Sequence, residues 1–446
     1  MTTSTVPRAA SPGTTSPGKP PARAALSTAL RTELRRGIAP WTGLAVALTL
    51  LVPLWSKAAQ WQGSWGETQT QLHATATLLG GPLVAAAACR QGGREHRRRT
   101  AELLLSVPRS RLAQVTTAAT PIALWAAAGY LLALAVVFAA TAPYTGAGGP
   151  SFSVVVVDLG LLLSLGFVGF VVGRLVRWRL TAPVLAALLY VLLGAPGYVE
   201  SGARFLSPAE QYALKGQVLV WWFAPVLLAW TGGIAVTVLL AYAARRRVLA
   251  VVPLALALAA GAVIAPTGED LLRDDPTATR RVCSAPAPGT PQLCVTAPDA
   301  PVLPSAAEAL EGMFSRLEGV PNAPARYVDS APKDGEASLA HVMRGWSVTR
   351  NKLTDPRAYA SETALSLTFR DCSDDSRRSE RKGAERLALT DDAVRTWLAG
   401  DDSPWDPDAR PLVTRLTAMP DADRRAWLGR YLATLKSCTP AEVPAL

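Results

Sequence analysis

The sequence has few of the residues on which metal and nucleophile chemistry depends. It contains three histidines and five cysteines in 446 residues, and none of them has the short Cys-x-x-Cys or His-x-x-x-His spacing of a zinc site. It contains no HExxH segment and no serine in a nucleophile-elbow pattern. We therefore predict no metal, no cofactor and no enzymatic activity.

A functional nucleotide-binding loop is also missing. The segment Gly13 to Lys19 resembles one, but Pro20 stands where a serine or threonine must bind magnesium. Residues 1–24 are rich in Pro, Ser, Thr and Gly and contain no apolar run, which predicts a disordered tail and not a signal peptide. The chain is therefore predicted to have no ATPase of its own.

Long apolar runs, by contrast, are abundant. A helix needs about 20 mostly apolar residues to cross a bilayer. Seven segments qualify: residues 38–55, 72–89, 115–140, 152–173, 180–199, 218–243 and 248–266. They predict a polytopic α-helical transmembrane domain at residues 25–266, followed by a separate domain at residues 267–446. The second span carries a Gly80-Gly81-Pro82 break, which neighbouring helices can compensate.

Charge predicts the orientation of these spans. Residues 1–266 hold 22 Lys/Arg and 7 Asp/Glu, whereas residues 267–446 hold 23 and 27. In the first part, 19 basic residues fall in the tail and in the loops after the second, fourth and sixth spans, and three fall in the alternate loops. The positive-inside rule then places the N-terminus in the cytosol and the C-terminal domain outside the cell membrane. Arginine outnumbers lysine 38 to 7, a bias typical of a GC-rich bacterial genome. Nucleic-acid binding is not expected, because the C-terminal part has no basic patch with interleaved aromatics.

The loop between the second and third spans, residues 89–111, contains seven arginines. Thr100 can serve as the N-cap of a short helix that Val107-Pro108 would end, and Ser110 can cap the third span. One interpretation is a helix lying along the membrane face. The other is an ordinary basic loop that only fixes orientation.

The order of residues in this loop resembles the corresponding loop of ABC type-2 permeases. There an acidic residue, a Thr-x-Glu step, a leucine pair, Ser-x-Pro and a final arginine precede the third span. Thr32 to Arg36 and the turn from Gly173 to Arg179 are also similar to that family, so the resemblance covers residues 25–245. It implies a homo- or heterodimeric membrane subunit that docks a separate ABC ATPase. The docking positions that it implies are Glu95, Thr100, Glu102, Ser106, Pro108 and Arg111.

The chain departs from that family in its seventh span and in the 180 residues that follow it. Three functions therefore stay open. The first is the membrane subunit of an ABC-type exporter-like complex, embedded in the lipid bilayer. The second is a membrane-anchored extracytoplasmic sensor or structural module without transport, and the third is an anchored extracytoplasmic enzyme.

Two features inside the spans stand out. Asp158 lies about six residues into the fourth span, and an intramembrane carboxylate is a candidate functional residue. Its position about 9 Å below the outer end favours a hydrated side chain near the interface. Gly166, Gly169 and Gly173 form a small-residue face, which favours close packing within the molecule.

The cysteines and the patterns of the C-terminal part predict a small α+β disulfide-bonded domain. Cys283, Cys294, Cys372 and Cys438 allow three pairings. The Pro/Gly-rich turn between Cys283 and Cys294 favours that pair, which leaves Cys372 with Cys438. Cys89, at the cytosolic end of a span, should stay reduced. We expect helices at 305–317, with a Ser305–Glu308 capping box, and at 391–398 and 420–437, and a strand at 363–369.

Overall fold

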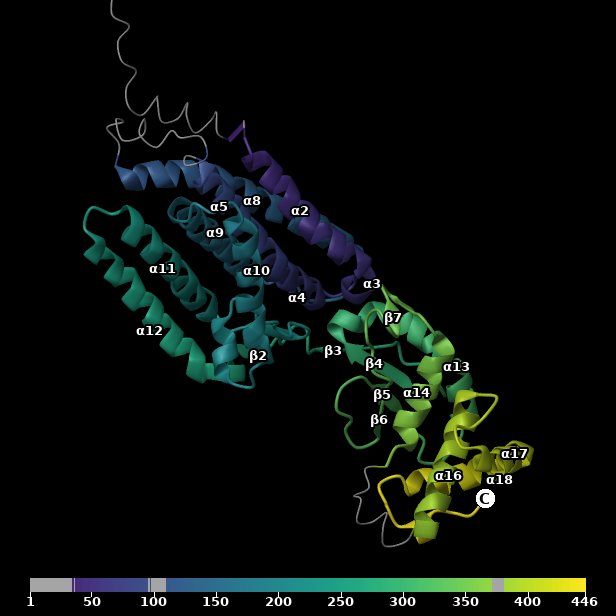
Figure 1. The fold of residues 1–446 in the computed structure, drawn as a ribbon. Helices are drawn as coiled ribbons and strands as arrows, with labels where there is room; N and C mark the ends of the chain where they lie inside the picture. Colours follow the sequence, from purple (N-terminus) through teal and green to yellow (C-terminus); the bar gives the residue numbers. More distant parts are fainter. Residues whose placement is uncertain (1–33, 36, 95–96, 98–109, 371–380) are drawn as a thin grey trace, which may run out of the picture.

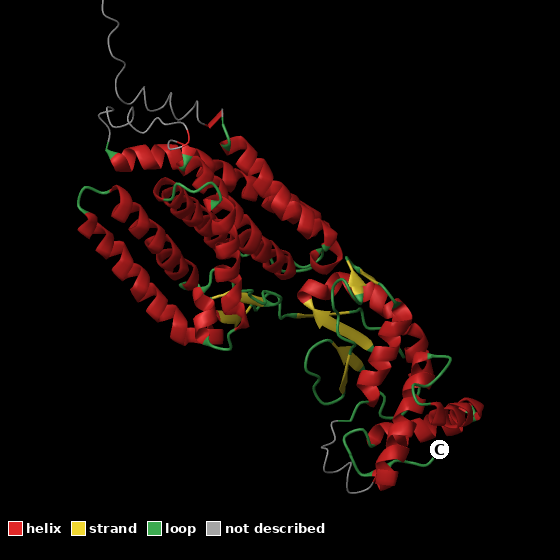
Figure 2. Ribbon diagram, in the orientation of Figure 1, coloured by secondary structure: helices red, strands yellow, loops and turns green. Residues whose placement is uncertain are grey.

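The computed structural model describes residues 34–35, 37–94, 97, 110–370 and 381–446 (Figure 1). Within these residues, seven helices are long and apolar enough to cross a membrane, as the apolar runs predict. They are formed by α2 (Ala39–Ser56), α4 with α5 (Trp65–Gly92), α8 (Arg111–Thr141), α9 (Phe152–Leu175), α10 (Thr181–Gly194), α11 (Phe223–Ala243) and α12 (Val251–Thr267). Adjoining 3-10 turns extend α8 to Tyr144 and α10 to Tyr198, and one begins the last span at Arg247. Strands are short and lie at one end of this bundle or beyond it (Figure 2).

The second span is continuous but changes its helical pitch. α4 (Trp65–Thr75) passes into a π-helical segment, Ala76–Gly80, and then into α5 (Gly81–Gly92). Pro82 has no N–H to donate within an α-helix, and a π-helical turn is a common way to accommodate such an interruption. The Gly80-Gly81-Pro82 break is therefore a local change of pitch within one rod.

The glycine face of α9 packs directly on α5. A Cβ atom on Gly169 would lie 2.2 Å from the Ala85 carbonyl oxygen, and one on Gly173 would lie 2.0 Å from that of Cys89. Only glycine permits such an approach. The prediction that this face packs within the molecule is confirmed.

The two ends of the bundle differ. At one end, α2 and α8 begin and α5, α9 and α11 finish. A buried apolar cluster joins these five helices there; its residues are Ala39, Ala88, Val115, Ala119, Ile122, Phe170 and Ala243. We call this the loop end, because the 93–110 loop leaves from it. We call the opposite end, which meets the C-terminal residues, the domain end (Figure 1).

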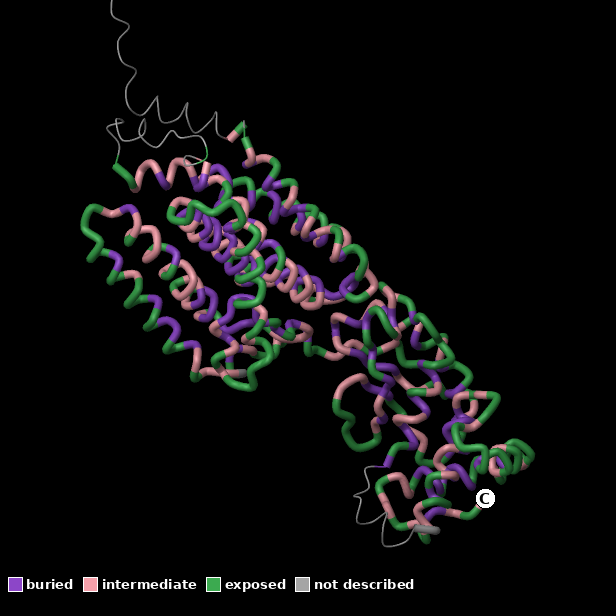
Figure 3. Tube along the Cα trace, viewed as in Figure 1, coloured by how far each residue is buried: buried purple, intermediate pink, exposed green. Residues whose placement is uncertain are grey.

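Many residues of the bundle helices are exposed (Figure 3), and many of these exposed residues are large and apolar. α10 and α12 are the clearest cases, and their most exposed apolar side chains are Leu188, Val191, Leu192, Val252 and Leu256. Surfaces of this kind suit contact with lipid.

Beyond the domain end, residues 276–370 and 381–446 form a mixed structure, which we call the C-terminal domain. It follows β2 (Leu272–Asp274), which pairs with β1 (Gln217–Leu219) of the α10–α11 connection. Its four-stranded sheet has the order β3 (Arg281–Cys283), β4 (Gln292–Thr296), β5 (Arg326–Val328), β6 (Glu336–Ser338). A small pair, β7 (Val348–Thr349) and β8 (Lys352–Leu353), and the helices α13 (Leu303–Leu317), α14 (Pro356–Thr368), α16 (Arg381–Ala399), α17 (Arg410–Ala418) and α18 (Asp421–Ala433) complete it.

Two local predictions in this domain are wrong. The segment expected as a strand at 363–369 belongs to α14, because Asp355 caps the helix by accepting from the Ala358 N–H and Pro356 occupies its first turn. The Ser305 capping box does not form either. α13 begins at Leu303, and the Ser305 hydroxyl accepts a hydrogen bond from the Leu353 N–H instead.

Candidate functional site

Most of the predicted docking loop lies outside the described residues. This applies to Glu95, Thr100, Glu102, Ser106 and Pro108. Arg111 is described: it is the exposed first residue of α8. Ser110 caps that helix by accepting from the Ala113 N–H at 3.3 Å, which confirms its predicted role.

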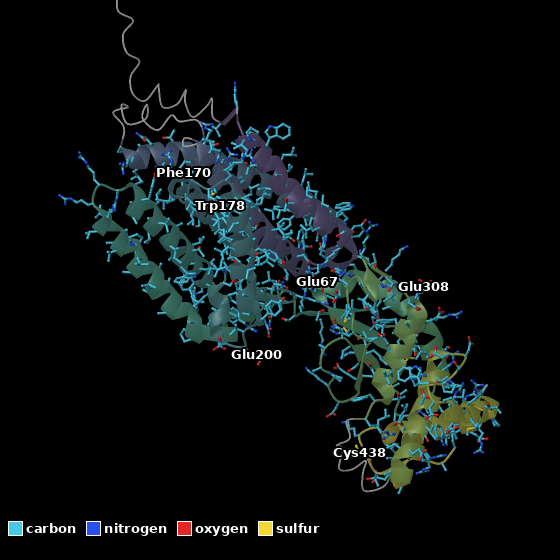
Figure 4. All side chains as sticks on the ribbon, viewed as in Figure 1. Glu67, Phe170, Trp178, Glu200, Glu308 and Cys438 are labelled. Carbon is cyan, nitrogen blue, oxygen red and sulfur yellow. A yellow bond between two sulfur atoms is a disulfide. The ribbon has the colours of Figure 1, made fainter. Side chains whose placement is uncertain are left out.

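The loop end is rich in arginine. The described arginines there are Arg35, Arg90, Arg94, Arg97, Arg111, Arg174, Arg177, Arg179, Arg245, Arg246 and Arg247. Figure 4 labels Phe170 and Trp178 at this end and Glu200 at the other. The basic residues of the loops at the domain end are Lys57, Arg204 and Lys215. The fold thus collects the basic loops of the bundle at the end opposite the C-terminal domain.

Asp158 is the centre of a buried polar cluster. Its side chain is 1% exposed, and its Oδ1 lies 2.5 Å from Nδ1 of His73 on α4. Tyr130 of α8 donates a hydrogen bond from its hydroxyl to the other carboxylate oxygen at 2.7 Å. His73 Nε2 lies 3.1 Å from the backbone oxygen of Glu210. Three spans and one connecting segment therefore meet at Asp158.

The hydrogen-bond partners of His73 determine which of its ring nitrogens must carry a hydrogen. A backbone carbonyl only accepts, so Nε2 must carry a hydrogen. One further proton lies between Nδ1 and Asp158, whichever of the two groups holds it. Both arrangements leave the pair with no net charge, which makes its burial tolerable.

The expectation that Asp158 is hydrated near the interface is wrong. The connection between α10 and α11 folds over this part of α9, and the Tyr212 ring lies 5.2 Å from the His73 ring. Tyr212, Val154 and Phe223 belong to one buried cluster above the carboxylate. This cover separates Asp158 from solvent. Its presence cannot be inferred by counting how many residues Asp158 lies from the end of the span.

A second polar cluster joins the bundle to the C-terminal domain. Arg344, whose side chain is fully buried, lies 2.5 Å from Asp299 and 3.4 Å from Glu67 at the start of α4. Its Nη1 also donates to the Arg350 carbonyl oxygen at 2.8 Å. Lys215 of the α10–α11 connection lies 3.4 Å from Asp299. We call these residues the junction cluster; Figure 4 labels Glu67 at this place.

Close contacts at two glycines reinforce the junction. A Cβ atom on Gly63 would lie 2.4 Å from Arg344, and one on Gly66 would lie 2.2 Å from the Leu214 carbonyl oxygen. Arg350 donates to the Gln62 side chain at 3.0 Å. The beginning of the second span is therefore held firmly against the C-terminal domain.

The cysteines largely follow the prediction. Cys283 and Cys294 form a disulfide across the β3–β4 pair, as expected. Cys438 is also disulfide-bonded, but its predicted partner Cys372 lies outside the described residues. Cys89 is a buried free thiol. Within the described part of the chain, no group of three or more His, Cys, Asp or Glu is placed to hold a metal ion.

Sequence reasoning missed His73 and Tyr130 as partners of Asp158, and it missed the junction cluster. The position of His73 follows once the packing of α9 on α5 is known. The sequence offset between His73 and Asp158 is 85 residues, close to the offset of the contacts that the glycine face makes with Ala85 and Cys89. The second and fourth spans run in the same direction, so equal offsets indicate equal depth. No comparable pattern predicts that Arg344, in a loop of the C-terminal domain, contacts the start of the second span.

These features define a class. Seven apolar helices, with a buried polar cluster among them and a disulfide-bonded domain at one end, are compatible with a multi-pass membrane protein. Compared with known proteins, the chain matches no family model, no curated protein and no solved structure.

Proposed function

We propose that this protein is the membrane subunit of an ABC-type exporter-like complex. It would dock a separate ATPase through residues 89–111, as a homo- or heterodimer of membrane subunits in the bacterial cell membrane. The C-terminal domain would lie outside the cell. Two observations favour the orientation: the basic loops gather at the end opposite that domain, and the domain contains a disulfide.

The observation that carries the proposal is the path of the second span. It starts in the junction cluster at Glu67 and reaches the loop end at Gly92, directly before the loop that resembles an ATPase docking site. At the loop end it packs backbone to backbone on α9. A force applied to the loop by ATP binding would therefore act along one rod on the C-terminal domain.

The docking role is tested by copurification. The tagged full-length protein is isolated from its own membranes and assayed for ATP hydrolysis, with Glu102→Lys and Arg111→Glu as loop variants. Arg246→Glu, at the same end but on the α11–α12 turn and outside the residues that resemble permeases, is the matched control. We expect ATPase activity to copurify with the unaltered chain and with the control, and to be lost with the loop variants. Equal activity in all four preparations, or none in any, would refute the proposal.

A sensor or structural module without transport is the second candidate. A cavity of about 330 Å³ in the C-terminal domain favours it, bordered by the aromatic side chains of Phe369 and Trp405 and by the ion pair of Arg370 with Asp391. Phe369 and Trp405 are 63% and 65% exposed. Binding of a cell-wall component that Trp405→Ala abolishes, with the 89–111 loop dispensable, would favour this function over the first.

A further inference from the structure

A second cavity, of about 570 Å³, lies at the domain end of the bundle. It is lined by Leu78 of the second span, by Tyr190 and Val191 of α10, by Tyr198 of the 3-10 turn that follows α10, and by Glu210 of the α10–α11 connection. Its volume falls in the range of small-molecule sites. Tyr190 and Val191 are 52% and 61% exposed, so the cavity borders the apolar outer face of α10.

Glu210 is the charged residue of this lining, and it is nine-tenths buried. Its Oε1 lies 3.6 Å from Nε of Arg204, whereas its Oε2 is buried with no hydrogen-bond partner among the described residues. Oε2 lies beside Gly197, another lining residue, where a Cβ atom would be 3.7 Å away. A buried carboxylate oxygen without a donor is costly, so a donor supplied by a ligand is strongly favoured.

We propose that this cavity binds an amphiphilic primary amine, whose ammonium N–H donates to Glu210 and whose apolar body packs against Leu78 and Val191. The carboxylate turns from its place beside Gly197 to meet the ammonium group. The rings of Tyr190 and Tyr198 offer further attraction for a cation. The ligand enters from the apolar face of α10, the side on which an amphiphile dissolved in lipid arrives. Its role as cargo rests on the proposed exporter function, whereas its binding does not.

The proposal implies a pH dependence. The titratable groups that face Glu210 are Arg204, His73 of the second span and Tyr212 of its own segment. Burial raises the pKa of Glu210, and the positive charge of Arg204 opposes this rise. Only the ionised carboxylate attracts an ammonium group. Affinity therefore falls as the pH drops through the raised pKa, and it falls at a higher pH than an ordinary glutamate would give.

Binding is measured on the purified full-length protein in phosphatidylcholine nanodiscs. The probe is monodansylcadaverine, a primary amine whose dansyl emission shifts to the blue in an apolar site. We expect saturable binding that Glu210→Gln weakens by about tenfold or more, the effect of losing a charged hydrogen bond. N-acetylation of the probe amine should weaken it equally. Glu200→Gln, an exposed glutamate of the same connection, is the control and should bind as the unaltered chain does.

A second variant keeps the test independent of the fold around Glu210. Val191→Trp fills the cavity from its exposed side and should abolish binding while the thermal midpoint of unfolding is unchanged. Unchanged affinity in Glu210→Gln, or equal affinity for the acetylated probe, overturns the proposal. Competition by nanodiscs that contain phosphatidylethanolamine identifies an aminolipid as the occupant, and its absence identifies a free amine. No ATPase is present in this assay, so its failure and the failure of ATPase docking are separate results.

Discussion

Replacing Arg344 by methionine tests whether the junction cluster holds the C-terminal domain on the bundle. Methionine retains an apolar stem of similar length and removes the guanidinium group. Asp299, which is 3% exposed, would then keep only Lys215 at 3.4 Å, and Glu67 would lose its partner at 3.4 Å. Removing one member of a buried ion pair costs about 3–5 kcal/mol, and the remaining Lys215 favours the lower end, about 3 kcal/mol.

The assay is thermal unfolding of the detergent-solubilised protein, followed by tryptophan fluorescence. A loss of about 3 kcal/mol should lower the Tm of a domain of this size by about 6–12 °C. Arg326→Met is the matched control, because Arg326 is itself half exposed and its partner Glu336, at 3.2 Å, keeps a second ion pair with Arg281. The double variant Arg344→Met/Asp299→Asn removes both charges and should recover part of the loss. A Tm for Arg344→Met no lower than that of Arg326→Met would show that the cluster does not hold the domain.

The bundle offers two further tests, both read as thermal unfolding in detergent. Asp158→Ala leaves Nδ1 of His73 and the Tyr130 hydroxyl without a buried partner and should cost about 2–4 kcal/mol. Asp158→Asn can still accept from Tyr130 and donate to His73, so it should cost far less. Equal losses would contradict the hydrogen-bonded cluster. Gly173→Ala places a Cβ atom 2.0 Å from the backbone of α5 and should cost about 1–3 kcal/mol. Gly166→Ala, whose Cβ atom would have its nearest neighbour at 3.4 Å, should be tolerated. The reverse order of stability would contradict the packing of α9 on α5.

The spans could be predicted because each is a local property of the sequence. A run of about 20 apolar residues needs no knowledge of its neighbours. The Cys283–Cys294 pair was predictable for the same reason, since a short turn joins the two strands that carry it. In contrast, the strand predicted at 363–369 is wrong. Its apolar residues, Ala364, Leu365, Leu367 and Phe369, fit a strand as well as a helix. The helix start at Asp355-Pro356, which decides between the two, lies eight residues before this segment.

The polar sites could not be predicted because their partners are distant in sequence. Asp158 was recognised as unusual, but its burial depends on a cover that includes Tyr212. Arg344 looked like one of many surface charges until Glu67 and Asp299 came beside it. Sequence patterns report the chemistry of a residue, and its environment requires the tertiary structure.

The π-helical segment Ala76–Gly80 determines where the second span and its neighbour α9 can tolerate the loss of a residue. Two contacts join these spans, His73 with Asp158 and Ala85 with Gly169. Between them the second span advances by 12 residues, whereas its parallel neighbour α9 advances by 11. The π-helical turn absorbs this one extra residue. Deleting a single residue within 76–80 should therefore convert the turn to α-helix and leave both contacts in place. A deletion in α9 between Asp158 and Gly169 would turn its carboxylate by about 100° away from His73.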